Sequence, residues 1–142
     1  MSKRSIAACV LLITLGSGCA KPVPTPPAAA KEPEAMTRTE FTDRLENYFE
    51  YEPLRAGKSS PFRIHLTDLS DGAPVEKADV TLTVRPKGGG EAVAETIARV
   101  GKVTGIYVAD LSVPRAGDYD IEFRIKNQKL DERLSLRDFR VE

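Results

Sequence analysis

Apolar and polar residues alternate along most of the chain from residue 38 onward. In one example Phe62, Ile64 and Leu66 alternate with charged or polar neighbours. A period of two is typical of strands that bury one face and expose the other. The pattern predicts strands at 47–51, 62–66, 80–84, 106–113, 119–125 and 134–141, and 93–100 is ambiguous, although its flanking glycines favour a strand.

About seven strands in about 105 residues, with regular turn signals, predict an all-β fold: an immunoglobulin-like antiparallel β-sandwich. Tyr119 follows a Pro-Arg-Ala-Gly-Asp turn and begins the sixth strand, where we expect a tyrosine corner. The chain has no tryptophan, and the cysteine pair of antibody domains is absent. Residues 38–47 are also compatible with a short helix, which Thr39 or Thr42 would cap.

The first 19 residues have the three-part layout of a secretory signal peptide. Lys3 and Arg4 are basic, residues 6–15 are almost wholly apolar, and three small residues precede Cys19. The alternative is a membrane anchor helix, but the apolar run is shorter than the roughly 20 residues of a membrane span.

Small residues before a cysteine at this distance from the start resemble a bacterial lipobox. The resemblance implies that Cys19 carries a lipid and becomes the first mature residue, while Cys9 is discarded. Gly16 stands where the lipobox has Leu, Val or Ile, which leaves ordinary signal-peptidase cleavage as the alternative. Ala20 after the cysteine, rather than Asp, resembles an outer-membrane address facing the periplasm.

Residues 19–37 are rich in proline and predict a tether without a folded core. Such a segment favours extended conformations and would hold a domain away from the membrane. A ligand for a proline-recognition module is the alternative. The chain therefore divides into a signal peptide at 1–18, the lipidated cysteine and tether at 19–37, and a β-sandwich domain at 38–142.

The amino-acid composition argues against several classes of function. Among 142 residues, 21 are Lys or Arg and 21 are Asp or Glu, so there is no basic surplus for binding nucleic acid. Two cysteines and one histidine do not supply a thiol-and-imidazole zinc site or a disulfide framework. No GxSxG motif and no second histidine are present for a catalytic triad, so we expect no enzyme and no cofactor.

Several segments resemble the N-terminal β-domain of periplasmic adaptor subunits of heavy-metal RND efflux systems. The matching segments are 41–54 (FTDRLENYFEYEPL), 57–58, 62–71 (FRIHLTDLSD), 74–75, 80–82, 88–90 and 114–119 (PRAGDY). This chain has no room for the helical hairpin, lipoyl-like and β-barrel domains of an adaptor. The copper-binding Met and His clusters of some adaptors are also missing. The resemblance therefore implies a free-standing accessory domain, without metal binding.

Three segments are candidates for a metal or phosphate site, and each also has a simpler structural interpretation. His65 should lie on the solvent side of its strand; as a metal ligand it is a weak candidate, because its neighbouring carboxylates suit soft metals poorly. Residues 68–72 (DLSDG) contain two carboxylates that calcium could bind, but a turn is favoured. Gly88, Gly89 and Gly90 lack the lysine and hydroxyl of a phosphate loop and predict a flexible turn.

Tyr48, Phe49 and Tyr51 form the densest aromatic cluster. Neighbouring residues of a strand point to opposite sides, so at least one of them is a candidate for an exposed partner contact. The alternative, that the cluster belongs to the core and a neighbouring loop, is favoured. The leading hypothesis is a lipid-anchored protein of the bacterial envelope that acts as a non-catalytic module of an envelope complex such as an RND metal-efflux system. The alternative is a periplasmic carrier of a small ligand or metal.

Overall fold

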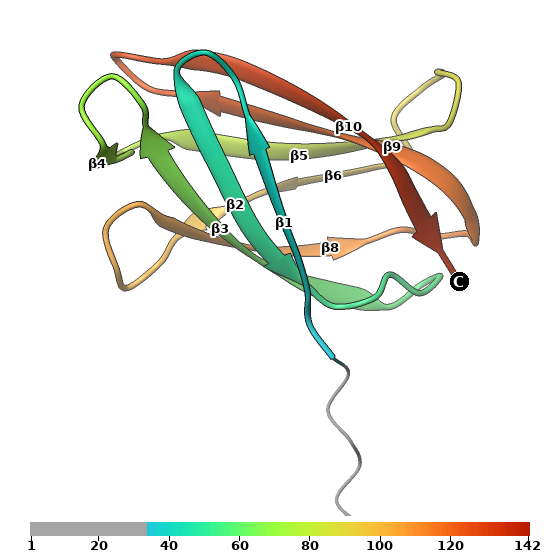
Figure 1. Ribbon diagram of the computed structural model, residues 1–142. Helices are drawn as coiled ribbons and strands as arrows, with labels where there is room; N and C mark the ends of the chain where they lie inside the picture. Colours follow the sequence, from blue (N-terminus) through green and yellow to red (C-terminus); the bar gives the residue numbers. More distant parts are fainter. Residues whose placement is uncertain (1–33) are drawn as a thin grey trace, which may run out of the picture. The chain divides into compact units, whose positions relative to one another are not determined.

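A computed structural model describes residues 34–142, and this part of the chain is built entirely from strands and turns (Figure 1). The ten strands are β1 (Met36–Phe41), β2 (Leu45–Tyr51), β3 (Ser59–Asp68), β4 (Ala73–Pro74), β5 (Asp79–Pro86), β6 (Ala94–Ile97), β7 (Arg99–Val100), β8 (Ile106–Ser112), β9 (Gly117–Lys126) and β10 (Asp131–Val141). Within these residues no helix is long and apolar enough to cross a membrane. The predicted signal peptide, Cys19 and most of the tether lie outside the described residues. The predicted boundary at residue 38 is two residues too late, because Met36 and Thr37 pair with β2.

The strands form two antiparallel sheets. Sheet A has the order β1-β2-β3-β8-β7, with β4 paired to β3, and sheet B has the order β10-β9-β5-β6. The two sheets pack face to face, as Figure 1 shows, with β1, β2 and β3 in front of β5, β9 and β10. The all-β, immunoglobulin-like sandwich predicted from the alternation is confirmed. The extra strands are the edge strand β1 and short pieces of two to four residues.

The core lies between the sheets and contains the apolar members of each alternating segment. In β3, for example, Phe62 and Ile64 are fully buried, while Arg63 between them is exposed. Phe49 from sheet A and Phe123 from sheet B meet at a ring separation of 4.9 Å. Burying rings of this size supplies much of the hydrophobic stabilisation of a small domain.

Two buried tyrosine hydroxyls fasten loops to the core. The Tyr107 hydroxyl donates a hydrogen bond to the carbonyl of Val75 at 2.9 Å and accepts one from the N–H of Ala78 at 3.0 Å. The Tyr119 hydroxyl donates to the carbonyl of Arg115, four residues upstream, at 3.0 Å. The second arrangement is a tyrosine corner, which confirms the prediction for Tyr119.

The possible helix at 38–47 is wrong, because this segment forms the β1–β2 hairpin. The Thr42 side-chain oxygen accepts hydrogen bonds from the N–H groups of Arg44 at 3.2 Å and Leu45 at 3.0 Å. These contacts resemble a helix cap, but here they close a tight turn between strands. The six residues of β1 pair along the whole length of β2, and this pairing replaces helical hydrogen bonds.

The ambiguous segment 93–100 crosses from one sheet to the other. Its first part, β6, pairs with β5 of sheet B, and its second part, β7, pairs with β8 of sheet A. The change occurs at Ala98, whose N–H donates to the carbonyl of Val80 at 2.8 Å. Because the buried side changes between the two sheets, one alternating pattern does not extend through the segment.

The two ends of the sandwich are built from different segments. At the end where β1 begins, the N–H of Ala56 donates to the carbonyl of Glu142 at 2.7 Å, so the C-terminus lies beside residues 52–58. At the opposite end the β1–β2 and β3–β4 turns touch, since the N–H of Leu69 donates to the carbonyl of Arg44 at 2.8 Å. We call the first the Met36 end and the second the far end.

Candidate binding surface

The structure separates the three aromatic residues that the sequence grouped together. Phe49 is fully buried between the sheets, so its assignment as a partner contact is corrected: it belongs to the core. Tyr51 is half-buried and stacks on Phe62 at a ring separation of 5.1 Å. Tyr48 lies on the outer face of sheet A, because it sits between two inward-facing residues of β2. Among the three, Tyr48 is the residue that offers its ring edge and hydroxyl to the outer face.

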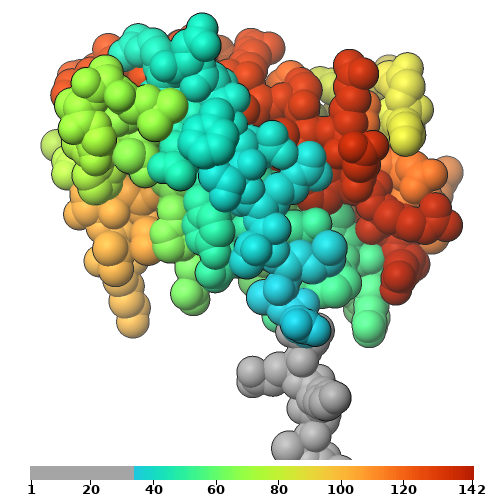
Figure 2. All heavy atoms as spheres, viewed as in Figure 1, coloured from blue at the N-terminus to red at the C-terminus, as the bar shows by residue number. Residues whose placement is uncertain are grey.

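Tyr48 belongs to a row of paired residues that crosses the outer face of sheet A. The backbone register aligns Thr39 of β1, Tyr48 of β2, His65 of β3 and Ile106 of β8. The Tyr48 and His65 rings meet edge to face at 5.2 Å. This ring contact and the Ile106 side chain give the row a largely apolar surface. Figure 2 shows this side of the molecule, with β1 and β2 in cyan and β3 in green.

Glu50 modifies the chemistry of this row. Its carboxylate accepts a hydrogen bond from the Tyr48 hydroxyl at 3.0 Å. The hydrogen bond, with smaller effects of desolvation and the nearby charge, raises the pKa of Tyr48 above its ordinary value of 10.0. The Tyr48 hydroxyl is therefore protonated and uncharged at neutral pH.

His65 lies on the outer face of its strand, as its position in the alternation predicted, and it is half-buried there. Its Nε2 atom is enclosed and has no hydrogen-bond partner among the described residues. Asp68 is three positions further along β3, so it points to the opposite, inner face and is buried. The strand thus separates the imidazole from the carboxylate that would have been its nearest metal-binding companion.

The segment 68–72 forms the predicted turn. One carboxylate oxygen of Asp68 accepts hydrogen bonds from the Ser70 N–H at 2.9 Å and the Ser70 hydroxyl at 2.6 Å. These bonds, that of the hydroxyl above all, lower the pKa of Asp68 below 3.8. Gly72, with φ of 71°, closes the turn by donating its N–H to the Asp68 carbonyl. Since one carboxylate oxygen already serves the backbone turn, the segment is explained without a cation.

The three glycines also form a turn, as predicted. Gly88, Gly89 and Gly90 all have positive φ, a region that side-chain-bearing residues avoid. The N–H of Gly89 donates to the carbonyl of Pro86 at 3.0 Å, which reverses the chain between β5 and β6.

An open groove of about 590 Å³ continues the Tyr48 row toward the edge of sheet A. It is lined by Arg63, Arg99, Val100, Gly101, Lys102, Val103, Ile106 and Val108. Val100 and Val103 are 67% and 60% exposed, and three cationic side chains surround them. Arg99 is paired with Asp110 at 3.1 Å. The groove thus offers apolar contact together with positive charge.

The sequence did not indicate this groove. Its apolar members come from β7, β8 and the loop between them, and their exposure depends on β7 being a two-residue edge strand. A signal was present in residues 97–103, where aliphatic and basic residues are mixed on both sides of Gly101. That signal has meaning only once the crossing between the sheets is known.

A second groove, of about 480 Å³, lies at the far end of the sandwich. Residues 68–77 form one wall and residues 127–130 the other, and the Asn127 amide donates to the Glu76 carbonyl at 3.0 Å between them. Its lining is mainly polar and of mixed charge. The polar side chains of Asp68 and Asn127 accept hydrogen bonds from backbone N–H groups of their own turns.

Comparison with known proteins does not assign the chain to a family. No protein-family model matches it, and no curated protein matches it. A solved structure titled "ZirS C-terminal Domain" is similar with a TM-score of 0.43 and 16% sequence identity, over 97% of this chain and 97% of that chain. The fold is an immunoglobulin-like β-sandwich, and the open groove lies beside the Tyr48 row on sheet A.

Proposed function

We propose that the chain is a lipid-anchored protein of the bacterial cell envelope whose β-sandwich is a non-catalytic binding module. In this proposal Cys19 carries the lipid, residues 20–35 ahead of β1 set the reach of the domain from the outer membrane, and the domain recognises a protein of an envelope complex in the periplasm. The resemblance of residues 41–119 to the β-domain of RND efflux adaptors makes a metal-efflux assembly the complex that we propose.

The observation that carries the proposal is the outer face of sheet A. Tyr48, Ile106 and Val108 give it an apolar centre, and Arg63 and Lys102 add positive charge beside the exposed valines. An apolar centre with a charged rim is the usual composition of a protein contact surface. A surface of this shape suits a folded partner better than an enclosed small molecule, since the groove is open rather than a deep cavity.

Affinity capture of the tagged full-length lipoprotein from membranes tests the function. The matched variants are Arg63→Glu on the outer face of sheet A and Arg133→Glu on the outer face of sheet B, both at exposed strand positions. We expect transporter components to be captured by the unmodified chain and by Arg133→Glu, and to be lost with Arg63→Glu. Capture without any envelope transport protein, or equal loss in both variants, would contradict the proposal.

The lipid anchor is tested separately by labelling cells with a radioactive fatty acid. Cys19→Ser should carry no label, because the thiol that accepts the lipid is removed. Cys9→Ser is the control and should be labelled like the natural chain. An unlabelled natural chain, or a labelled Cys19→Ser variant, would contradict lipidation of Cys19.

A further inference from the structure

β1 is a regular free edge along its whole length in the part of the chain that the structure describes. Its six residues pair with β2 on one side, and no strand pairs on the other. The other edge strands β6 and β7 have four and two residues. Short strands are a usual protection of sheet edges, whereas a longer free edge is a template for another strand.

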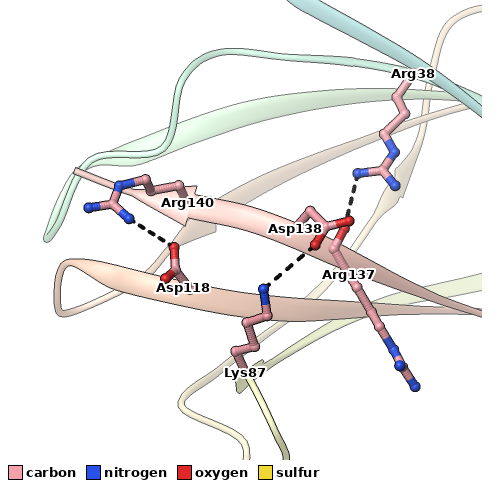
Figure 3. Close-up of polar contacts among 6 residues, drawn as sticks. All are labelled: Arg38, Lys87, Asp118, Arg137, Asp138 and Arg140. Atoms are coloured by element: carbon pink, nitrogen blue, oxygen red, sulfur yellow. Dashed lines mark hydrogen bonds and ion pairs between the residues drawn. The ribbon is translucent and has the colours of Figure 1, made fainter.

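The remaining edge strand, β10, is regular over its first six residues, Asp131–Leu136, and is then interrupted by a bulge. At the bulge Asp138 has a φ of 82°, unusual for a residue with a side chain, and its carboxylate lies 3.8 Å from the Lys87 ammonium. At the same place the Arg38 guanidinium donates to the carbonyl of Arg137 at 3.3 Å and so caps the backbone of β10 (Figure 3). The bulge and the cap prevent a regular strand from pairing along the whole of β10, whereas β1 has no such interruption.

The hairpin geometry identifies which backbone groups of β1 are free. The N–H of Thr42 bonds to the carbonyl of Leu45, so this pair is a hydrogen-bonded pair of the ladder. Hydrogen-bonded pairs alternate along antiparallel strands, which turns every second residue of β1 away from β2. The N–H and C=O groups of Thr37, Thr39 and Phe41 therefore point to the open edge.

The side chains around this edge are complementary to a second copy of themselves. Arg38 and Glu40 flank Thr39 on either side, and they already form an ion pair of 2.7 Å within the chain. If β1 of another copy runs antiparallel with Thr39 opposite Thr39, then Arg38 of each copy faces Glu40 of the other. The same register places Phe41, which is 61% exposed, opposite Thr37.

We propose that two copies of this chain pair through β1, antiparallel and centred on Thr39, so that two A sheets become one continuous sheet. Thr37, Thr39 and Phe41 of the two copies would form about six backbone hydrogen bonds across the two-fold axis. The occupant is a second copy, because the charge order Arg38-Thr39-Glu40 is self-complementary only in this register. The proposal does not depend on the lipid anchor or on the envelope partner.

Single cysteines at two matched positions test the register. Thr37 and Thr39 are both exposed threonines on the same face of β1. At the two-fold axis, Thr39→Cys would place two Cα atoms about 5.5 Å apart, within the range of a disulfide. Thr37→Cys would place them about 14 Å apart, since four residues of rise separate the two positions. Residues 19–142 with Cys19→Ser provide a soluble chain without another thiol.

We expect Thr39→Cys to form a disulfide dimer under mild oxidation at least about tenfold faster than Thr37→Cys, given those separations. Equal rates, or no dimer from either variant, would overturn the proposal. Analytical ultracentrifugation of the cysteine-free chain should show a reversible dimer. Thr39→Pro should weaken this dimer without unfolding the domain, because it removes an N–H that faces away from β2. Thr39→Lys gives a second test with a charged edge.

The same measurements report on other occupants of the edge. If an extended segment of another protein uses β1, the purified chain will sediment as a monomer at all concentrations, and the proposal fails. If another face holds two copies together, Thr39→Pro and Thr39→Lys will leave the dimer intact, and the proposal also fails.

Discussion

Replacing Tyr107 with Phe removes one oxygen atom from the core and tests how the β4–β5 connection is held. The hydroxyl bonds two backbone groups, the Val75 carbonyl and the Ala78 N–H, and all three residues are at least nine-tenths buried. Without the hydroxyl both backbone groups lose this partner, and water does not easily reach them. An unsatisfied buried group costs about 1–3 kcal/mol, so Tyr107→Phe should lower the free energy of unfolding by about 2–4 kcal/mol.

Two further Tyr→Phe variants calibrate this number within the same domain. Tyr119→Phe loses one hydrogen bond, to the carbonyl of Arg115, and should cost about 1 kcal/mol. Tyr48→Phe loses a bond to Glu50 on the solvent face and should change stability least of the three. The expected order of destabilisation is therefore Tyr107, then Tyr119, then Tyr48.

Urea unfolding followed by far-ultraviolet circular dichroism is the suitable assay. The chain has no tryptophan and only four tyrosines, so a fluorescence signal would change with each variant itself. An unchanged dependence on urea concentration would show that only stability was altered. The reasoning is refuted if Tyr107→Phe lowers the free energy of unfolding less than Tyr119→Phe does. The Tyr107 hydroxyl would then not be the group that satisfies the Val75 carbonyl and the Ala78 N–H.

The same urea assay tests three other substitutions. Asn47 is fully buried in β2, and neither the oxygen nor the nitrogen of its amide has a hydrogen-bond partner among the described residues. Asn47→Leu should therefore raise the free energy of unfolding by about 1–2 kcal/mol. A lower free energy of unfolding would instead indicate a buried water at the amide. Gly105→Ala should cost more than about 1 kcal/mol, because φ is 79° and the added Cβ would approach the Pro74 Cβ to 2.6 Å; no loss would mean that the turn can shift. Asp68→Asn should be less stable than the natural chain at pH 7, and the difference in the free energy of unfolding should shrink as the pH falls below about 4. A carboxyl group whose pKa is lowered by folding stabilises the protein above its unfolded-state pKa, and this stabilisation is lost when the carboxylate is protonated. A difference that does not change with pH would contradict the role of the Ser70 hydrogen bond.

The sandwich could be predicted because most strands bury one face, so apolar and polar residues alternate along their sequences. Segments such as 62–66 and 119–125 follow this rule, and the turn before Tyr119 adds a second, independent signal. The hairpin at 38–47 was missed since a threonine oxygen accepts N–H groups two and three residues later in both a helix cap and a tight turn. Only the pairing of β1 with β2, which is tertiary, decides between them.

The placement of the aromatic residues of β2 was predicted only in part, and one residue explains why. Leu45, Asn47 and Phe49 all point inward along β2, and this parity would have assigned Phe49 to the core and Tyr48 to the outer face. Asn47, a polar residue inside the core, hides that parity in the sequence. The groove near Val100 was missed because its exposure follows from the crossing between sheets at Ala98.

The chain enters and leaves the sandwich at one end. β1 begins opposite Tyr51, and Glu142 donates its N–H to the carbonyl of Leu54 only a few residues further on. A domain whose ends lie close together can be spliced into a loop of a longer protein without pulling its sheets apart. The fold is therefore a transferable cassette: the same 109-residue stretch, 34–142, could serve by itself or as an insert in a larger chain, with its far end left free in either setting.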